Sequence, residues 1–241
     1  MNLIIDVGNT RVKWALFNNS KLVKTVVEPY STVNKSNRKC FKKNKIDHII
    51  VSLVGTEDIF DQTLFKDHKN VMYLDHTTRV PFKNNYESPK TLGVDRIALV
   101  SAAAIKYPKK NVLIIDAGTC ITYDILNKKN EYLGGAISPG INIRFKALNE
   151  YTANLPLLKI ARFSLLGKNT RSSILSGVLN GTIQEIEGVI KQYSHKYPDL
   201  TVVLTGGDAN FLAKKLKSSI FAIPNFLLEG LNRILIHNTD E

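Results

Sequence analysis

The sequence predicts an α/β protein made of two similar domains, each a mixed sheet with flanking helices. Two nearly identical stretches carry this prediction, LIIDVGNT at residues 3–10 and LIIDAGT at 113–119. Each is an apolar run that ends in an acidic glycine turn, and each is followed by a pattern typical of further strands. A third strand with a glycine turn, TVVLTGGD, occupies 201–208. We interpret the repeat as an internal duplication, with domains at 1–109 and 110–241.

The composition is that of an ordinary folded protein. The chain has 241 residues, of which 44% are apolar, and we see no apolar run long enough for a membrane span or a signal peptide. Its two cysteines, Cys40 and Cys120, lie far apart and form no CxxC pair. We therefore expect reduced thiols, no membrane partner and a cytoplasmic location.

The net charge of +12 raises the question of a nucleic-acid partner. The lysines are scattered along the chain, and only residues 35–45 form a dense basic run, without interleaved aromatic residues. This pattern favours a solvated surface over nucleic-acid binding as the main function. The positive field can still help to gather anionic substrates.

The first half reads as a series of strands followed by a helix. In 11–17 the side chains alternate, with Val12, Trp14 and Leu16 on one face and Arg11 and Lys13 on the other, which predicts a half-buried strand. Residues 80–92 are typical of a loop. The expected strands are 2–5, 11–17, 21–27, 48–54 and 71–75, and the expected helices are 33–45, 57–67 and the alanine-rich 94–107, which Pro108 ends.

The second half begins the same way and then becomes more helical. Residues 134–140, GGAISPG, are expected to form an elbow rich in glycine and proline. Apolar residues spaced by threes and fours predict an amphipathic helix over 171–194. The expected strands are 112–116, 121–126, 131–133 and the one that ends in the glycine pair of 201–208, and two further helices are expected at 210–216 and 226–236.

The acidic glycine turn is suited to binding phosphate. Its glycine lets the backbone approach a ligand, and successive N–H groups can line an anion site. Asn9 and Thr10 add side-chain donors, while Asp6 can hold Mg²⁺ through water. A single such turn is also consistent with a plain hairpin. The two copies and the third turn at Gly206 and Gly207 together resemble the ribonuclease H-like ATPase domains of actin, hexokinase and Hsp70, which implies an ATP cleft between the domains.

Other common motifs do not match. GKNT at 167–170 lacks the upstream glycine of a P-loop, since position 162 is Arg. The five histidines show no metal-ligand spacing, and there is no GxSxG elbow.

Six short motifs in order give a closer resemblance. They are DVGNTR at the amino terminus, YESPKTLGVDR at 86–96, DAGTCIT from Asp116, GGAISPG, TANLP at 152–156 and GKNT. This set, which covers almost the whole chain, resembles the type III pantothenate kinases. The resemblance implies ATP-dependent phosphorylation of pantothenate to 4′-phosphopantothenate, the first step of coenzyme A biosynthesis, by a homodimer that needs Mg²⁺ and a monovalent cation, K⁺ or NH₄⁺.

The same resemblance assigns roles to residues. Asp95 becomes the general base, Asp116 the monovalent-cation ligand and Asp6 the residue that organises Mg²⁺ through water. Thr170 would contact pantothenate from the opposite subunit, with the substrate site near the dimer interface. The implied pantothenate site is Tyr86, Gly93, Val94, Asp95, Arg96 and Thr170, and the implied ATP site is Asp6, Val7, Gly8, Asn9, Thr10, Arg11, Val12, Lys13, Thr119, Gly206 and Gly207.

Plainer interpretations remain for several of these residues. Asp95 could be only an acid in a helix first turn, Arg96 a partner in a surface salt bridge, and Thr170 the N-cap of the long helix. Gly177 and Gly181 lie on one helix face and permit close approach of another helix, in the same chain or in a second subunit. Cys120 stands where the family pattern favours Ala or Ser.

Two alternative functions stay open at this point. One is another small-molecule kinase or a polyphosphate hydrolase of the same superfamily. The other is a regulatory protein that retains nucleotide binding.

Overall fold

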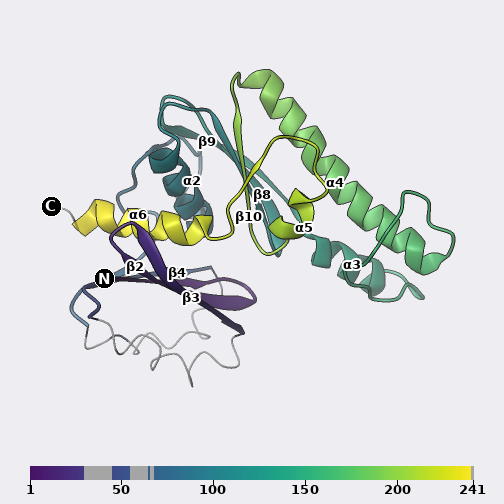
Figure 1. The fold of residues 1–241 in the computed structure, drawn as a ribbon, viewed down its shortest axis with the longest axis horizontal. Helices are drawn as coiled ribbons and strands as arrows, with labels where there is room; N and C mark the ends of the chain where they lie inside the picture. The colour runs from purple at the N-terminus through teal and green to yellow at the C-terminus, as the bar shows by residue number, and fades with distance from the viewer. Residues whose placement is uncertain (30–44, 55–64, 66–67, 240–241) are drawn as a thin grey trace. The chain divides into compact units, whose positions relative to one another are not determined.

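The computed structural model describes residues 1–29, 45–54, 65 and 68–239 (Figure 1). Several predictions lie outside the described residues. They are the helices expected over 33–45 and 57–67, of which only Lys45 and Phe65 are described, the basic run at 35–45 and Cys40. In chain order the elements are β1 (Asn2–Val7), β2 (Arg11–Asn18), β3 (Lys21–Pro29), β4 (His48–Leu53), β5 (Val71–Tyr73), β6 (Lys83–Asn84), the 3₁₀ turn η4 (Pro89–Thr91), α2 (Val94–Lys106), β7 (Val112–Ala117), β8 (Cys120–Leu126), β9 (Glu131–Pro139), α3 (Ile141–Glu150), α4 (Thr170–Lys196), β10 (Thr201–Thr205), α5 (Ala209–Ala213), β11 (Phe221–Ala222) and α6 (Phe226–Thr239).

The chain divides into two compact units. Unit 1 contains residues 1–108, 130–132 and 225–241, and unit 2 contains 109–129 and 133–224. The carboxy-terminal helix α6, which the sequence repeat grouped with the second half, therefore packs in unit 1. Residues 130–132 also belong to unit 1, so that β9 begins there and continues in unit 2.

Unit 1 contains a five-stranded sheet in the order β3-β2-β1-β4-β5. Strand β1 runs antiparallel to β2 and parallel to β4, which aligns the carboxyl ends of β1 and β4. The predicted inward face of β2 is confirmed, because Val12, Trp14 and Leu16 belong to one buried cluster with residues of β1 and β4. The prediction of a half-buried strand was wrong at its far end, where Ala15 and Phe17 are buried as well.

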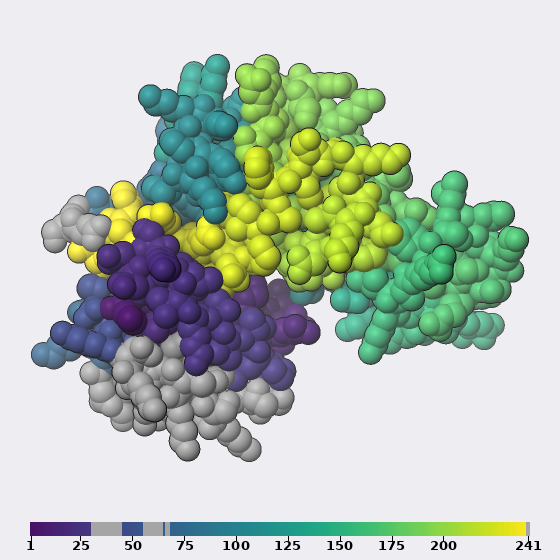
Figure 2. All heavy atoms as spheres, in the orientation of Figure 1, coloured from purple at the N-terminus to yellow at the C-terminus, as the bar shows by residue number. Residues whose placement is uncertain are grey.

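Helices α6 and α2 lie next to each other in unit 1, and α6 covers one face of the five-stranded sheet. Helix α6 packs on β1 and β4 and also against α2, and in the space-filling view its yellow atoms lie against the purple amino-terminal strands (Figure 2). A methyl group on Gly230 of α6 would stand only 1.9 Å from the carbonyl oxygen of Ala98 in α2. The alanine run of α2 thus serves close helix packing as well as helix propensity.

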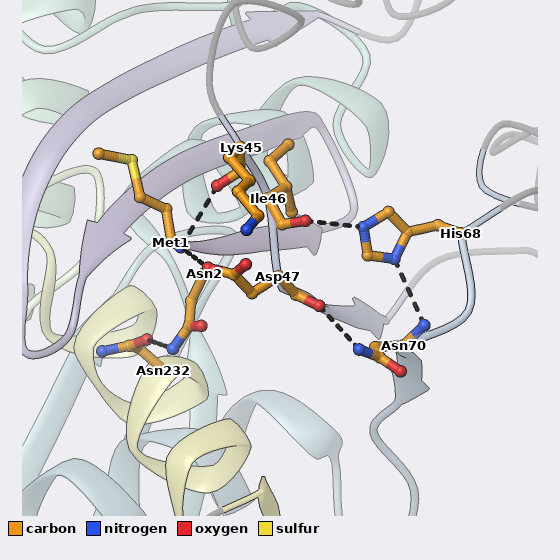
Figure 3. A network of polar contacts seen from close by, with 8 residues as sticks. All are labelled: Met1, Asn2, Lys45, Ile46, Asp47, His68, Asn70 and Asn232. Atoms are coloured by element: carbon orange, nitrogen blue, oxygen red, sulfur yellow. Dashed lines mark hydrogen bonds and ion pairs between the residues drawn. The ribbon is translucent and has the colours of Figure 1, made fainter.

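Polar contacts fasten the amino terminus to its surroundings in unit 1 (Figure 3). The amino group of Met1 forms an ion pair with Asp47, just before β4. Asn70 donates from Nδ2 to the carbonyl of Asp47 at 3.0 Å, and Asn2 donates to Asn232 of α6 at 3.0 Å. These contacts hold the starts of β1, β4 and β5 next to one another.

The second sheet has the order β11-β10-β7-β8-β9-β6. Strand β7 is antiparallel to β8 and parallel to β10, as β1 is antiparallel to β2 and parallel to β4. The periodicity over α4 is confirmed, since its apolar residues enter the core of unit 2 together with those of β7, β8 and β10. Helix α5 ends at Ala213, three residues before the predicted end.

The expected elbow at 134–140 was wrong. Its residues, up to Pro139, continue β9, and the following helix α3 was not predicted. A methyl group on Gly135 would lie 1.6 Å from the carbonyl oxygen of Tyr123, so this glycine lets β9 pass very close to β8. Gly134 takes a positive φ of 102°. Gly135, one of the glycines that suggested a turn, is therefore required by strand packing.

Candidate functional site

The first glycine turn joins β1 to β2 in unit 1. Gly8 donates its N–H to the carbonyl of Arg11 at 3.1 Å, which closes the turn. Asp6, next to the end of β1, is 3% exposed, and Lys13 of β2 reaches it with Nζ 3.4 Å from Oδ2. The register pairs these two residues directly across the strands. An acid and a base thus meet where β1 enters the turn.

The second oxygen of Asp6 is the feature that fits a cation. Oδ1 is buried and has no hydrogen-bond partner among the residues that the structure describes. Burial raises the pKa of the Asp6 carboxyl above its ordinary value; Lys13 opposes this rise, and the charge of Asp95 adds to it. A hydrated divalent cation would satisfy Oδ1 and favour the ionised carboxylate, so the donor set suits Mg²⁺.

Ser52 is a polar residue of this site that the sequence reasoning missed. It pairs with Asp6 across the parallel strands β1 and β4, so that both side chains lie on the same face. Its Oγ is fully buried and likewise has no partner within the described ranges. The signal was present in HIIVSLV, where one hydroxyl interrupts an apolar strand.

Asp95 lies in the first turn of α2, as expected. Its Oδ1 accepts a hydrogen bond from the N–H of Arg96 at 2.8 Å. A methyl group on Gly93, the N-cap, would stand 2.4 Å from this same oxygen, so glycine is needed there for the carboxylate to keep its position. Because the charge of Asp95 contributes to the raised pKa of Asp6, the two carboxylates lie within electrostatic reach of each other in unit 1.

Arg96 lies beside two tyrosine rings. It is only 5% exposed, which excludes the surface salt bridge considered from the sequence. Its guanidinium carbon is 5.4 Å from the ring centre of Tyr86 and 6.0 Å from that of Tyr132. The two rings are themselves stacked, with centres 5.9 Å apart. Tyr86 was predicted for the site, whereas Tyr132, far along the chain on β9, was not.

The second and third glycine turns meet in unit 2. Asp208 donates its N–H to the carbonyl of Ala117 at 2.9 Å. Gly206 has a φ of 97°, and a methyl group on it would lie 2.3 Å from Oδ1 of Asp116 and 2.4 Å from the carbonyl oxygen of Ala117. The backbone of the 206–208 turn is therefore in direct contact with the end of β7, where Asp116 was predicted to act.

Helix α3 begins against the same turn. Gly140, its N-cap, donates its N–H to the carbonyl of Thr119 at 3.1 Å, and a methyl group there would be 2.2 Å from the carbonyl oxygen of Gly118. Arg144 of α3 fixes the start of this helix. It donates a hydrogen bond to the carbonyl of Pro139 at 2.9 Å and forms an ion pair with Glu185 of α4. Cys120 is exposed beside this turn.

The start of α4 corrects one interpretation of Thr170. The N-cap is Asn169, whose side chain accepts the N–H of Ser172 at 2.9 Å in a capping box. Thr170 is the first helical residue and is exposed. Gly177 and Gly181, further along α4, are also exposed, and methyl groups on them would meet no atom of the described residues within 4 Å. Thr170 is thus available for a contact other than capping.

The predicted site residues therefore form two groups. In unit 1 the structure brings Asp6, Lys13 and Asp95 together, with Arg96 and Tyr86 next along α2 and its preceding loop. In unit 2 it brings the turn of Asp116 and Thr119 together with Gly206 and Gly207. Over the described ranges no three His, Cys, Asp or Glu side chains gather as a metal cage.

No helix in the described part of the chain is both long and apolar enough to cross a membrane.

The chain has two units of sheet and helices, each with an acidic glycine turn after its first strand. This is the fold of the actin- and hexokinase-type ATPases. Solved structures agree on the fold. A conserved protein of the Baf transcriptional-activator family from Campylobacter jejuni is 24% identical, with a TM-score of 0.64 over 99% of this chain and 100% of that chain. A glucokinase from an Antarctic psychrotroph is 13% identical, with a TM-score of 0.56 over 99% of both chains.

Sequence comparison identifies the family. The family model described as type III pantothenate kinase matches residues 2–192. The type III pantothenate kinase of Christiangramia forsetii is 50% identical, with 99% of each chain covered. That of Flavobacterium johnsoniae is 43% identical over 100% of this chain and 99% of its own. The chain belongs to the type III pantothenate kinase family.

Proposed function

We propose that the protein transfers the γ-phosphoryl group of ATP to pantothenate and forms 4′-phosphopantothenate, the first step of coenzyme A biosynthesis. Family membership over the whole chain carries this proposal. The acidic site of unit 1 supports it, because a primary alcohol that attacks a phosphoryl group needs a base at hand, with charge compensation nearby.

Asp95 is the proposed general base. It would accept the proton of the acceptor hydroxyl as that oxygen attacks the γ-phosphorus. The Arg96 N–H, which donates to Oδ1 at 2.8 Å, fixes the position of the carboxyl group. Gly93 and Val94 place it at the head of α2. Arg96 supplies a fixed positive charge that suits the carboxylate of pantothenate.

The residues assigned to ATP are Asp6 to Lys13 in unit 1 and Thr119, Gly206 and Gly207 in unit 2. Asp6 would hold Mg²⁺ through water, in agreement with its buried Oδ1, which has no hydrogen-bond partner in the described part of the chain. When bound, Mg²⁺ neutralises charge on the phosphates. Asp116 is assigned to a monovalent cation, K⁺ or NH₄⁺. By sequence, we assign residues 1–109 to an amino-terminal and 110–241 to a carboxy-terminal ATPase domain. The packing differs from this division at the end of the chain, because α6 belongs to unit 1.

We also propose a homodimer in which Thr170 contacts pantothenate bound to the opposite subunit. The exposed start of α4 and the open glycine face at Gly177 and Gly181 support this assignment. Gly181→Leu should weaken the dimer in analytical ultracentrifugation. The control is Gly207→Ala, which also adds a side chain where no atom lies within 4 Å but is not on α4. A dimer of unchanged dissociation constant in Gly181→Leu would remove α4 from the interface.

One assay tests the activity. Purified protein is mixed with Mg-ATP and pantothenate, with and without KCl, and ADP release is followed. Pantothenate-dependent ADP that requires KCl is expected. ADP release that is independent of pantothenate would instead favour a polyphosphate hydrolase, and ADP release only with another alcohol would favour a different kinase of the superfamily.

Asp95→Asn tests the base. Turnover should fall at least about 100-fold, while ATP binding stays near that of the wild type. Asp199→Asn is a matched control, because Asp199 is exposed in a left-handed turn that Asn also favours. Near-full activity of Asp95→Asn would show that the base is another residue.

A further inference from the structure

We propose that Tyr132 is a positioning residue for the acceptor site, which holds Arg96 and Tyr86 in the orientation that binds pantothenate. This inference rests on the proposed function and deepens it. Tyr132 lies on β9, far in sequence from the 86–96 motif, and none of the site assignments above includes it. Four observations in unit 1 support the role.

The first observation is burial. Tyr132 is fully buried, at 0% exposure, although it lies only at the second residue of a strand. Phe82 packs against it edge-on, with ring centres 6.0 Å apart. A large ring clamped in this way has few rotamers available, so it can serve as a rigid surface for its neighbours.

The second observation is the backbone pairing between β6 and the start of β9. Lys83 donates its N–H to the carbonyl of Asn130 at 2.9 Å, and Asn85 donates to the carbonyl of Tyr132 at 3.0 Å. Asn130 also donates from Nδ2 to the carbonyl of Pro81 at 2.6 Å. The loop that carries Tyr86 is therefore hydrogen-bonded along the strand that carries Tyr132, up to the residue before Tyr86.

The third observation is the stacked pair of tyrosines. The rings of Tyr86 and Tyr132 have centres 5.9 Å apart and an interplanar angle of 24°. Tyr86 is partly exposed and can face a ligand, whereas Tyr132 is covered. The buried ring thus fixes the plane of the exposed one.

The fourth observation is the shared guanidinium. Arg96 lies 5.4 Å from the centre of Tyr86 and 6.0 Å from that of Tyr132, so the cation and the two rings form a nearly equilateral cluster. Cation–π attraction and stacking are both directional, so they restrict the side chain that follows the proposed base. Removing one ring should loosen the other two groups.

The expected consequence is a loss of acceptor binding rather than of chemistry. A side chain that acts through Arg96 and Tyr86 should alter the KM for pantothenate, whereas Asp95 stays anchored by its own bond to the Arg96 N–H and by Gly93. The KM for ATP should stay close to its wild-type value, because Phe82 and Asn85, which pack on or hydrogen-bond to Tyr132, are not among the residues assigned to ATP.

The test compares Tyr132→Leu, which removes the ring, with Tyr132→Phe, which keeps it. Steady-state kinetics of pantothenate-dependent ADP release should show a KM for pantothenate about 10-fold higher in Tyr132→Leu, corresponding to about 1.4 kcal/mol. The KM for ATP should remain within about two-fold, and kcat within about three-fold. Tyr132→Phe should restore the wild-type KM for pantothenate.

Phe17→Leu is the matched control, since it also removes a fully buried ring in unit 1 but lies at the end of β2 away from the turn. It should leave both KM values unchanged. If Tyr132→Leu does not fold, Asn130→Gly replaces it: glycine keeps the left-handed turn, at φ 63°, and removes only the bond to Pro81. A rise of about three-fold in the KM for pantothenate is then expected.

Three results would overturn the inference. An unchanged KM for pantothenate in folded Tyr132→Leu, or in Asn130→Gly if Tyr132→Leu does not fold, would make Tyr132 a core residue only. Equal rises in both KM values would indicate general loosening of the fold. A wild-type protein without pantothenate-dependent ADP release would overturn the proposed function and this inference together, so the wild-type reaction is measured first.

Discussion

Replacing Gly206 by alanine should destabilise unit 2 and disturb the end of β7. The φ of 97° at this residue costs an L-residue about 1–2 kcal/mol. The new methyl group would also lie 2.3 Å from Oδ1 of Asp116 and 2.4 Å from the carbonyl oxygen of Ala117. That carbonyl accepts the N–H of Asp208 at 2.9 Å, so it cannot move away without weakening a hydrogen bond worth about 1 kcal/mol.

Together these costs lower the free energy of unfolding by about 2–4 kcal/mol, since relaxation relieves part of the clash. For a chain of this length, that corresponds to a fall in Tm of about 5–15 °C. Because Gly206 is itself assigned to ATP, and Asp116, assigned to the monovalent cation, must also shift, the affinity for ATP should fall in the same variant.

Gly207→Ala is the control for this prediction, because a methyl group on Gly207 meets no atom within 4 Å over the ranges that the structure describes, and its φ is not positive. Thermal unfolding followed by circular dichroism should give Gly207→Ala a Tm within about 2 °C of the wild type. Equal Tm values for the two alanine variants would refute the reasoning, since the contact with β7 would then be absent.

The other predictions concern unit 1. Gly230→Ala should lower the free energy of unfolding by about 2–4 kcal/mol, because its methyl group meets the carbonyl oxygen of Ala98 at 1.9 Å; stabilisation in urea unfolding would contradict this contact. Glu28→Ala should lower the free energy of unfolding by about 1–3 kcal/mol, because Glu28 accepts the buried indole N–H of Trp14 at 2.7 Å. The fluorescence emission of Trp14, the single tryptophan, should shift in this variant. For Asp6, burial raises the carboxyl pKa in the folded state, so stability present at acid pH is lost as the pH rises through that pKa. Asp6→Asn should therefore gain stability relative to the wild type from about pH 4 upward while losing phosphoryl transfer; a stability difference that does not vary with pH would contradict it.

Some of the site could be predicted from the sequence because it depends on neighbouring residues. The turn at Asp6 and Gly8 follows directly from an apolar strand that ends in an acid and a glycine, and the structure closes that turn as expected. Asp95 was likewise placed at a helix start by the residues that follow it. The roles of these residues toward ATP and pantothenate remain predictions, carried by the family resemblance.

Other features of the site depend on contacts between distant residues. Tyr132 reaches Tyr86 and Arg96 of the 86–96 motif only because β9 pairs with β6 in unit 1. Ser52 faces Asp6 only because β4 lies parallel to β1 in that register. The glycines of 134–140 predicted an elbow, since a glycine required by close strand packing cannot be told from a turn glycine without its neighbour.

The sequence by itself determined the elements that local physics specifies: the apolar strands 2–5 and 112–116, the acidic glycine turns that follow and the amphipathic α4. The tertiary structure alone decided which strands pair, that α6 packs with α2 in unit 1, and that Tyr132 joins Arg96 and Tyr86. The reason is physical. Side-chain period and turn chemistry are properties of adjacent residues, whereas strand partners and buried ring contacts are set by burial of surface across the whole fold.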